Sequence, residues 1–311
     1  MTRLKPHLPW ITLLVLVVIV GIAQPAFLHP ANLLSLAGDI VPLFIMALGL
    51  TFAIYIGGID LSAQSMANMI TVIASLYLAH LGIWVGLLCV LVGFLLGTLS
   101  GVVTTRLRVP SFISTLAVGG ICFSIAQWLS GNRALNMDAA ERNALFGWMI
   151  GRTGIVPNEL FIALGLLILC LFIERRTVLG RVLKAVGAGE PAAAAAGINV
   201  RRYKVLAFAI SGALAAVAGL LFAVKLSGGA PTIANGFLLP AIVAVLVGGT
   251  PLTGGVGGVL NTAIGTLIVA VIRASMLYFG VEATQQQMLF GLVLILAIAL
   301  TMDRAKLRTV K

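Results

Sequence analysis

The chain has 311 residues, of which 60% are hydrophobic and only 9% are charged. A soluble globular chain is nearer half apolar and a quarter charged, so this composition excludes a soluble protein and requires lipid as the surrounding solvent. The net charge of +11 does not indicate nucleic-acid binding, because Lys and Arg form short clusters between apolar runs rather than one basic face.

Ten apolar runs follow one another along the chain. A bilayer core is crossed by about 20 apolar residues in a helix, and most of these runs approach that length. The sequence therefore predicts an all-α integral membrane protein with about ten transmembrane helices, some of them broken, in a single domain of residues 1–311. The candidate spans are 9–26, 39–57, 63–79, 83–105, 111–129, 159–173, 205–224, 237–248, 259–279 and 288–302.

The positive charges fix an expected orientation. If the N-terminus is inside and the spans alternate, 15 of the 20 Lys and Arg residues fall in inside segments and four fall outside. Cytoplasmic loops collect Lys and Arg, so we expect both termini in the cytoplasm. Arg273 falls inside the ninth span. No clear A-x-A cleavage site follows the first run, which we expect to remain as an uncleaved helix.

Two glycine-rich stretches interrupt long apolar runs. GGIDLSAQS (57–65) and GGTPLTGGVGG (248–258) share the pattern Gly-Gly-x-x-Leu-Ser/Thr, one in each half of the chain. The pattern hints at an internal repeat of the kind found in transporters. Backbone polar groups in a break need protein or water partners, so the breaks suggest a cavity or pathway. Asp60 lies in the first break, either lining this pathway or capping the next helix.

Small residues are dense elsewhere in the spans. SGALAAVAGL (211–220) and the series Gly93, Gly97 and Gly101 are examples. Such faces let helix backbones approach closely, so we interpret most of the 35 glycines as packing residues.

Several kinds of chemistry find no support in the sequence. There is no Walker A motif, no H-E-x-x-H motif and no Ser-His-Asp set, so the chain is expected to be neither an ATPase nor another enzyme and to bind no cofactor. We interpret the cysteines in apolar runs as small buried hydrophobes and the isolated histidines as interfacial residues, which leaves no metal site. These residues are Cys89, Cys122, Cys170, His7, His29 and His80.

A basic loop in the middle of the chain, about 174–204, is the most informative segment. It reads ERRTVLGRVLKAVGAGEPAAAAAGINVRRYK. Residues 190–196 predict a short Ala-rich helix with Pro191 in its first turn and Gly197 as its stop. A short helix between basic turns suits docking to a soluble partner. From the residues alone, a basic loop that only sets topology explains the segment equally well.

The same loop resembles a known family. GRVLKAVGAGEPAAAAAGI (180–198) is similar to the coupling-loop motif of bacterial ABC-importer permeases for ribose, xylose, arabinose and autoinducer-2. Four further segments match that family in the same order along the chain, and the resemblance covers nearly all of it. They are GGIDLS (57–62), RLRVPSFISTLAV (106–118), YKVLAFAISGALAAVAGL (203–220) and LVGGTPLTGGVGGVL (246–260).

The resemblance implies a division of labour among subunits. Two permease subunits, identical or paralogous, form the pathway in the bacterial cytoplasmic (inner) membrane. Cytoplasmic ABC ATPase subunits carry ATP and Mg and dock on the coupling loop. A periplasmic solute-binding protein delivers a sugar or sugar-like polyol. The coupling residues that this implies are Gly180, Arg181, Ala185, Gly187, Glu190, Ala194 and Gly197.

The candidate pathway residues include two departures from the family. The family has Val-Gly-Ser where this chain has Ala63, Gln64 and Ser65, and Gly where it has Asn261. Amides at Gln64, Asn68, Gln127 and Asn261 suit either a hydroxyl-rich solute or hydrogen bonds between helices. The pathway candidates are Gly57, Gly58, Asp60, Ser62, Gln64, Ser65, Asn68, Gly248, Gly249 and Asn261.

Two other readings stay open. The same importer architecture suits a non-sugar solute, such as an amino acid or a nucleoside. A self-sufficient secondary transporter, which would need no ATPase partner and would respond to ion gradients, is the alternative from a different class. Asp60 is its best candidate for an ion-coupled acid.

Overall fold

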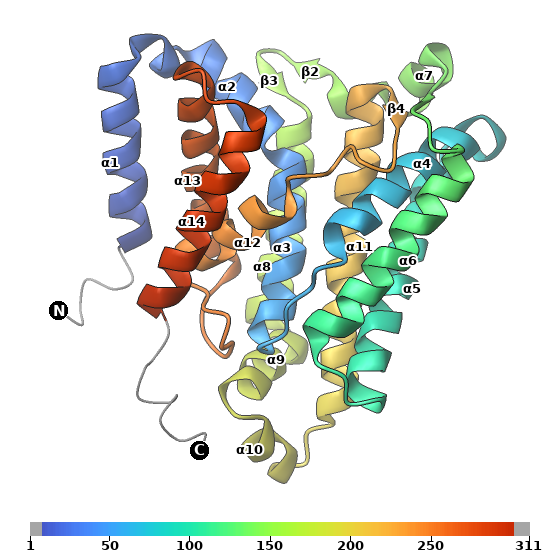
Figure 1. Ribbon diagram of the computed structural model, residues 1–311, viewed down its shortest axis with the longest axis vertical. Coiled ribbons are helices and arrows are strands. Elements are labelled where there is room, and N and C mark those ends of the chain that lie inside the picture. Colours follow the sequence, from blue (N-terminus) through green and yellow to red (C-terminus); the bar gives the residue numbers. More distant parts are fainter. Residues whose placement is uncertain (1–7, 302–311) are drawn as a thin grey trace.

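The computed structural model describes residues 8–301, and they confirm the expected all-helical architecture (Figure 1). The first half contains α1 (Leu8–Ala23), η2 (Pro25–Leu28), α2 (Pro30–Asp39), α3 (Val41–Tyr55), α4 (Ala63–Leu81), α5 (Trp84–Arg106), α6 (Ser111–Ser130) and α7 (Ala139–Ile150). The second half contains α8 (Glu159–Arg176), α9 (Val178–Ala188), α10 (Glu190–Ala195), α11 (Val200–Leu226), α12 (Leu238–Val247), α13 (Val259–Tyr278) and α14 (Ala283–Thr301).

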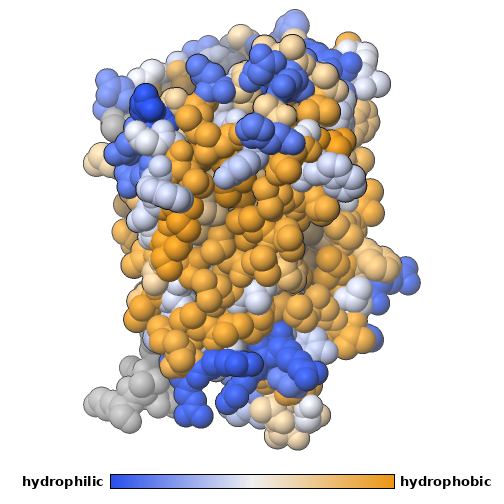
Figure 2. Space-filling model, turned by 90° about the vertical axis from the view of Figure 1, so that its right-hand side faces the viewer, coloured by the Kyte–Doolittle hydropathy of each residue, from blue (hydrophilic) through white to orange (hydrophobic). Residues whose placement is uncertain are grey.

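Four helices of the described residues are long and apolar enough to cross a membrane, namely α5, α6, α11 and α13. The pair α2–α3 makes a fifth span if its two parts, bent by 47°, count as one. Parts of α1 and α14 and all of α12 are apolar but shorter. The surface supports a membrane protein, because an apolar band separates two polar ends (Figure 2). The total of ten spans stays a prediction.

The α2–α3 bend corrects the second predicted span. The run 39–57 was expected as one helix beginning at Asp39, whereas α2 ends at Asp39 and α3 begins at Val41. Pro42 stands in the first turn of α3, where its missing N–H costs nothing. Every residue of α3 is buried, so this helix packs in the core of the protein and does not face lipid.

The long helix α11 packs along α5, α3 and α4 at the centre of the molecule. Gly93, Gly97 and Gly101 of α5 meet the backbone of α11, and a Cβ atom on Gly97 would overlap the Phe208 carbonyl. This confirms the interpretation of these glycines as packing residues. Backbone approach between the two helices excludes larger side chains here.

The two ends of the molecule differ. The coupling end, as we call it, carries α9 and α10, and the start of α1 and the end of α14 point toward it (Figure 1). The far end carries α7, a helix in a stretch where the sequence predicts no span, and two short antiparallel ribbons. The ribbons pair β1 (Leu135–Asn136) with β4 (Gly228–Gly229), and β2 (Arg152–Thr153) with β3 (Val156–Pro157).

Two segments of irregular backbone reach the middle of the molecule. Residues 57–62 rise from the coupling end to the start of α4, and residues 230–237 descend from the far end to α12 (Figure 1). Helices α4 and α12 therefore begin near mid-height.

Candidate coupling and translocation sites

The basic loop folds into two helices where the sequence predicted one. Glu190 begins α10 and Gly197 follows it with φ +81°, as expected for a helix stop. The additional helix, α9, begins after Thr177, whose side chain accepts a 3.4 Å hydrogen bond from the Gly180 N–H. Thr177 is a typical N-cap residue and is a local signal for this helix. The helix was not predicted because the segment was interpreted as a basic loop.

The predicted coupling residues divide into two groups. Gly180 packs on the backbone at Glu174, and Gly187 packs on the Tyr55 carbonyl and the Gly255 amide. These two glycines seat α9 against the rest of the protein. The other five residues are exposed, namely Arg181, Ala185, Glu190, Ala194 and Gly197.

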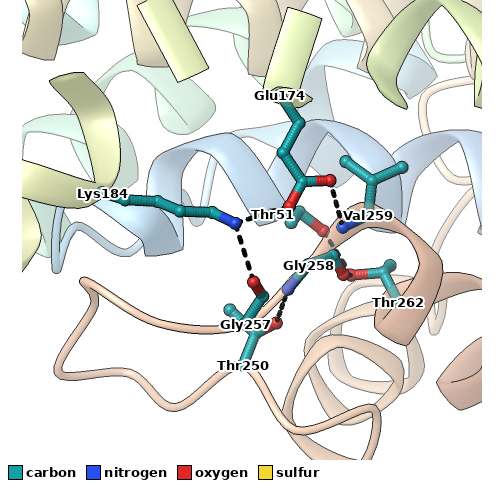
Figure 3. Close-up of polar contacts among 8 residues, drawn as sticks. All are labelled: Thr51, Glu174, Lys184, Thr250, Gly257, Gly258, Val259 and Thr262. Atoms are coloured by element: carbon teal, nitrogen blue, oxygen red, sulfur yellow. Dashed lines mark hydrogen bonds and ion pairs between the residues drawn. The ribbon is translucent and has the colours of Figure 1, made fainter. Parts of the chain in front are cut away.

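Glu174, at the end of α8, is the centre of a polar cluster that sequence reasoning missed (Figure 3). Its side chain is only 6% exposed, and Oε1 lies 2.6 Å from Lys184 Nζ of α9. Oε2 accepts a 3.0 Å hydrogen bond from the N–H of Val259, the first residue of α13. A carboxylate at a helix N-terminus is stabilised by the unpaired N–H groups and the helix dipole.

Lys184 connects α9 to the second glycine break. Its Nζ also donates to the Gly257 carbonyl at 2.9 Å and lies 5.0 Å from the centre of the Tyr55 ring. Within the same break, Thr250 Oγ1 accepts a 3.3 Å hydrogen bond from the Gly258 N–H (Figure 3). Helices α8, α9 and α13 and the glycine-rich loop therefore share one set of polar contacts.

The two glycine breaks contact each other. The Gly255 N–H donates to the Tyr55 carbonyl at 2.9 Å, and a Cβ atom on Gly57 would lie 3.2 Å from the Thr253 carbonyl. Gly57 and Gly254 have φ values of +69° and +76°, a region that suits glycine. The two stretches of like sequence therefore meet beside α9, at the coupling end.

Asp60, in the first break, is almost fully buried. Its Oδ1 accepts hydrogen bonds from the N–H and the hydroxyl of Ser62, at 2.9 and 2.5 Å, and Oδ2 accepts from the Ser211 hydroxyl at 2.6 Å. The carboxylate thus holds the turn before α4 and ties it to α11. Asp60 is therefore a buried residue that fixes this turn, and it does not cap α4, whose first N–H groups bond no side chain.

Two of the predicted amides lie in α4 and hold the segment before α12. Gln64 Oε1 accepts from the N–H groups of Gly236 and Leu238 at 3.1 and 3.3 Å. Asn68 Oδ1 accepts from the Ala234 N–H at 2.6 Å. Both side-chain amides donate to Asn235 Oδ1, at 3.3 and 2.9 Å. Asn235 was missed because an isolated Asn in a loop carries no local signal.

A cavity of about 650 Å³ adjoins the first break at the coupling end. Gly57 and Gly58 form part of its wall, together with the start of α11 and the turn between α5 and α6. Its polar and charged lining includes Thr104, Thr105, Arg108, Ser111, Glu190, Arg201 and Lys204.

A family model described as "Branched-chain amino acid transport system / permease component" matches residues 32–298. The chain belongs to this family. The ribose import permease protein RbsC of Escherichia coli (strain K12) is 33% identical over 93% of this chain and 91% of its own length. RbsC of Bacillus subtilis (strain 168) is 32% identical over 96% and 92%. The xylose transport system permease protein XylH of Escherichia coli (strain K12) is 28% identical over 88% and 85%.

These relatives confirm the resemblance drawn from the motifs, and the chain is a multi-pass membrane permease. The remaining predicted residues of this permease do not form one site. Gln127 hydrogen-bonds Asn132, after the end of α6, at 3.1 Å. Asn261 packs through its backbone against Gly248, in the second break. Neither amide has a hydrogen bond to Gln64 or Asn68 within residues 8–301.

Other predicted residues of the permease contribute to packing. Ser65 lies against Gly119 of α6, and Gly249 has φ +101°, a conformation open to glycine. Arg273 of α13 lies with its guanidinium 4.5 Å from the centre of the Phe237 ring, a cation–π contact in which the ring face attracts the charge.

Proposed function

We propose that the chain is the membrane-spanning subunit of an ATP-binding-cassette importer that moves a sugar or sugar-like polyol into the cell. The observation that carries this proposal is the near full-length similarity to import permeases named for ribose and xylose. The branched-chain amino acids in the family description support an amino acid as the second candidate solute.

The partners follow from this assignment. Cytoplasmic ATPase subunits dock on the exposed residues of α9 and α10 and hold the ATP and Mg, so the permease itself binds no cofactor and catalyses no reaction. A second permease subunit, identical or paralogous, completes the pathway, and a periplasmic solute-binding protein delivers the solute at the far end.

The topology belongs to the same proposal. The coupling end faces the cytoplasm, both termini lie there, and about ten spans of a single domain, residues 1–311, cross the bacterial cytoplasmic (inner) membrane. The distribution of Lys and Arg along the sequence supports this orientation.

In this proposal the ATPase subunits move the permease by displacing α9. A shift of α9 moves Lys184 and Gly187 directly, and through them the Gly257 carbonyl, the start of α13 and the end of α3. Because both glycine breaks meet there, one displacement acts on the two irregular segments together. A conformational switch needs contacts that differ between its states, and the ion pair between Glu174 and Lys184 is the contact we expect to change.

Affinity purification of the tagged permease from mild detergent, followed by mass spectrometry, tests the assignment. Recovery of an ATPase subunit with a Walker A motif is the expected result. A permease that purifies alone and transports solute in vesicles without ATP would instead support the secondary transporter.

A further inference from the structure

A polar surface lies near mid-height, where α4 begins and residues 230–237 descend to α12 (Figure 1). Here the backbone is irregular, and Thr232 and Asn235 are exposed. We call the surface formed by Gln64, Thr232 and Asn235 the amide face; Asn68, which is buried, supports it from α4.

The amide face leaves hydrogen-bonding capacity unused. Asn235 Oδ1 accepts hydrogen bonds from Gln64 and Asn68, but Asn235 Nδ2 has no partner among residues 8–301. The neighbouring backbone is held from the other side, where Gln287 of α14 donates to the Gly236 carbonyl at 2.9 Å. The free amide group is therefore fixed in place by contacts with α4, and its loop by contacts with α14.

Lipid is a poor cover for this surface. Irregular backbone and polar side chains at membrane depth are tolerated where they line water or are buried in protein, and not where they face hydrocarbon. Each unsatisfied polar group in hydrocarbon costs several kcal/mol. The amide face must therefore meet water, solute or another protein chain.

We infer that the amide face lines the water-filled pathway and contacts the solute directly, with Asn235 Nδ2 donating to a solute hydroxyl. This inference rests on the proposed function and assigns the solute contact to one surface. A neutral, hydroxyl-rich solute fits, because the face offers amide donors and acceptors and no charged side chain. On the coupling side of α4, Gly57, Gly58 and Ile59 line the cavity of about 650 Å³.

Cysteine accessibility tests the water contact. The native Cys89, Cys122 and Cys170 are buried and give a low background. Thr232→Cys and Asn235→Cys are compared in membrane vesicles with Ile168→Cys, an apolar position in the middle of α8 that is 58% exposed. The probe is a charged, membrane-impermeant thiol reagent.

We expect both amide-face cysteines to react at least about tenfold faster than Cys at position 168, because the thiolate that reacts forms in water and not in lipid. Reaction no faster than the control would overturn the inference. So would an oxidant-induced disulfide between two copies of the Asn235→Cys variant without reagent labelling, since that result indicates a dry contact between subunits. None of these readouts requires an ATPase, so the inference and the proposed function can fail separately.

A transport measurement tests the hydrogen bond to the solute. With loaded binding protein in excess, Asn235→Leu is expected to lower uptake per ATP hydrolysed by about tenfold, the loss of one hydrogen bond, and Asn235→Gln to restore part of it. Gln127→Leu, which removes a half-buried amide bonded to Asn132, serves as the matched control. Equal uptake by the Asn235→Leu and control variants would contradict the contact.

Discussion

Glu174 and Lys184 show how burial makes the two members of one ion pair unequal. The Glu174 side chain is 6% exposed and that of Lys184 is 30% exposed. If Glu174 is neutralised, Lys184 can still reach water. If Lys184 is removed, the carboxylate stays buried with the Val259 N–H as its main partner. An uncompensated buried charge is more costly than a lost exposed one.

Lys184→Met should therefore destabilise the permease more than Glu174→Gln. We expect about 3 kcal/mol for Lys184→Met and about 1 kcal/mol for Glu174→Gln, the loss of a single polar contact. Thermal unfolding in detergent measures both. Lys204→Met is the control, because its pair with Glu190 is half exposed and should contribute at most about 1 kcal/mol. The reverse order of the first two variants would contradict this account of burial.

The contact between α5 and α11 shows that the effect of a glycine also depends on its surroundings. Their contact depends on glycines that allow backbone to touch backbone, whereas other helical glycines, namely Gly120, Gly165 and Gly291, have open space around the Cβ position. The two kinds look alike in the sequence.

Gly97→Leu should consequently lower stability by at least about 1–3 kcal/mol, the typical cost of overpacking. Gly120→Leu is matched in chemistry, lies on α6 with nothing near its Cβ position, and should be close to neutral. Yield and unfolding temperature in detergent provide the measurement. Equal behaviour of the two variants would show that the α5–α11 contact is looser than described.

The proposed function makes α9 and α10 the element on which uptake depends. Glu190 is exposed at the start of α10 and its carboxylate lies 2.6 Å from Lys204 Nζ. Glu190→Lys reverses the charge on the proposed docking surface and brings two cations together.

We therefore expect Glu190→Lys to abolish uptake while the permease still inserts and accumulates in the membrane, as measured by transport and by immunoblotting of membranes. Gly197→Trp, which places a bulky side chain beside the same helix at φ +81°, should act alike. Normal uptake by both variants would exclude a docking role for this segment.

The sequence predicts those features of the fold and the site that depend on neighbouring residues, and misses those that depend on residues far apart in the chain. The all-helical architecture, α10 with Pro191 and Gly197, and the packing glycines follow from run lengths and local residue types. The contacts of Glu174 with Val259, and of Asn235 with Asn68, join residues 85 and 167 positions apart. No periodicity or cap predicts such pairings, because they arise only when the broken helices fold back together.

For the whole molecule, the orientation in the membrane can be tested at α10. A cysteine at Ala194, which is exposed, should be labelled by an impermeant reagent in inside-out vesicles and protected in intact cells. The positive-inside distribution of Lys and Arg is the physical reason. Labelling of intact cells would place the coupling end outside and reverse the proposed topology.

The most direct test of the importer assignment is solute uptake by the purified permease in proteoliposomes, with its co-purifying ATPase inside and the loaded binding protein outside. The account predicts uptake of a sugar only when ATP and Mg are enclosed, and loss of that uptake with Glu190→Lys. Uptake that proceeds without ATP and follows an imposed ion gradient would contradict it.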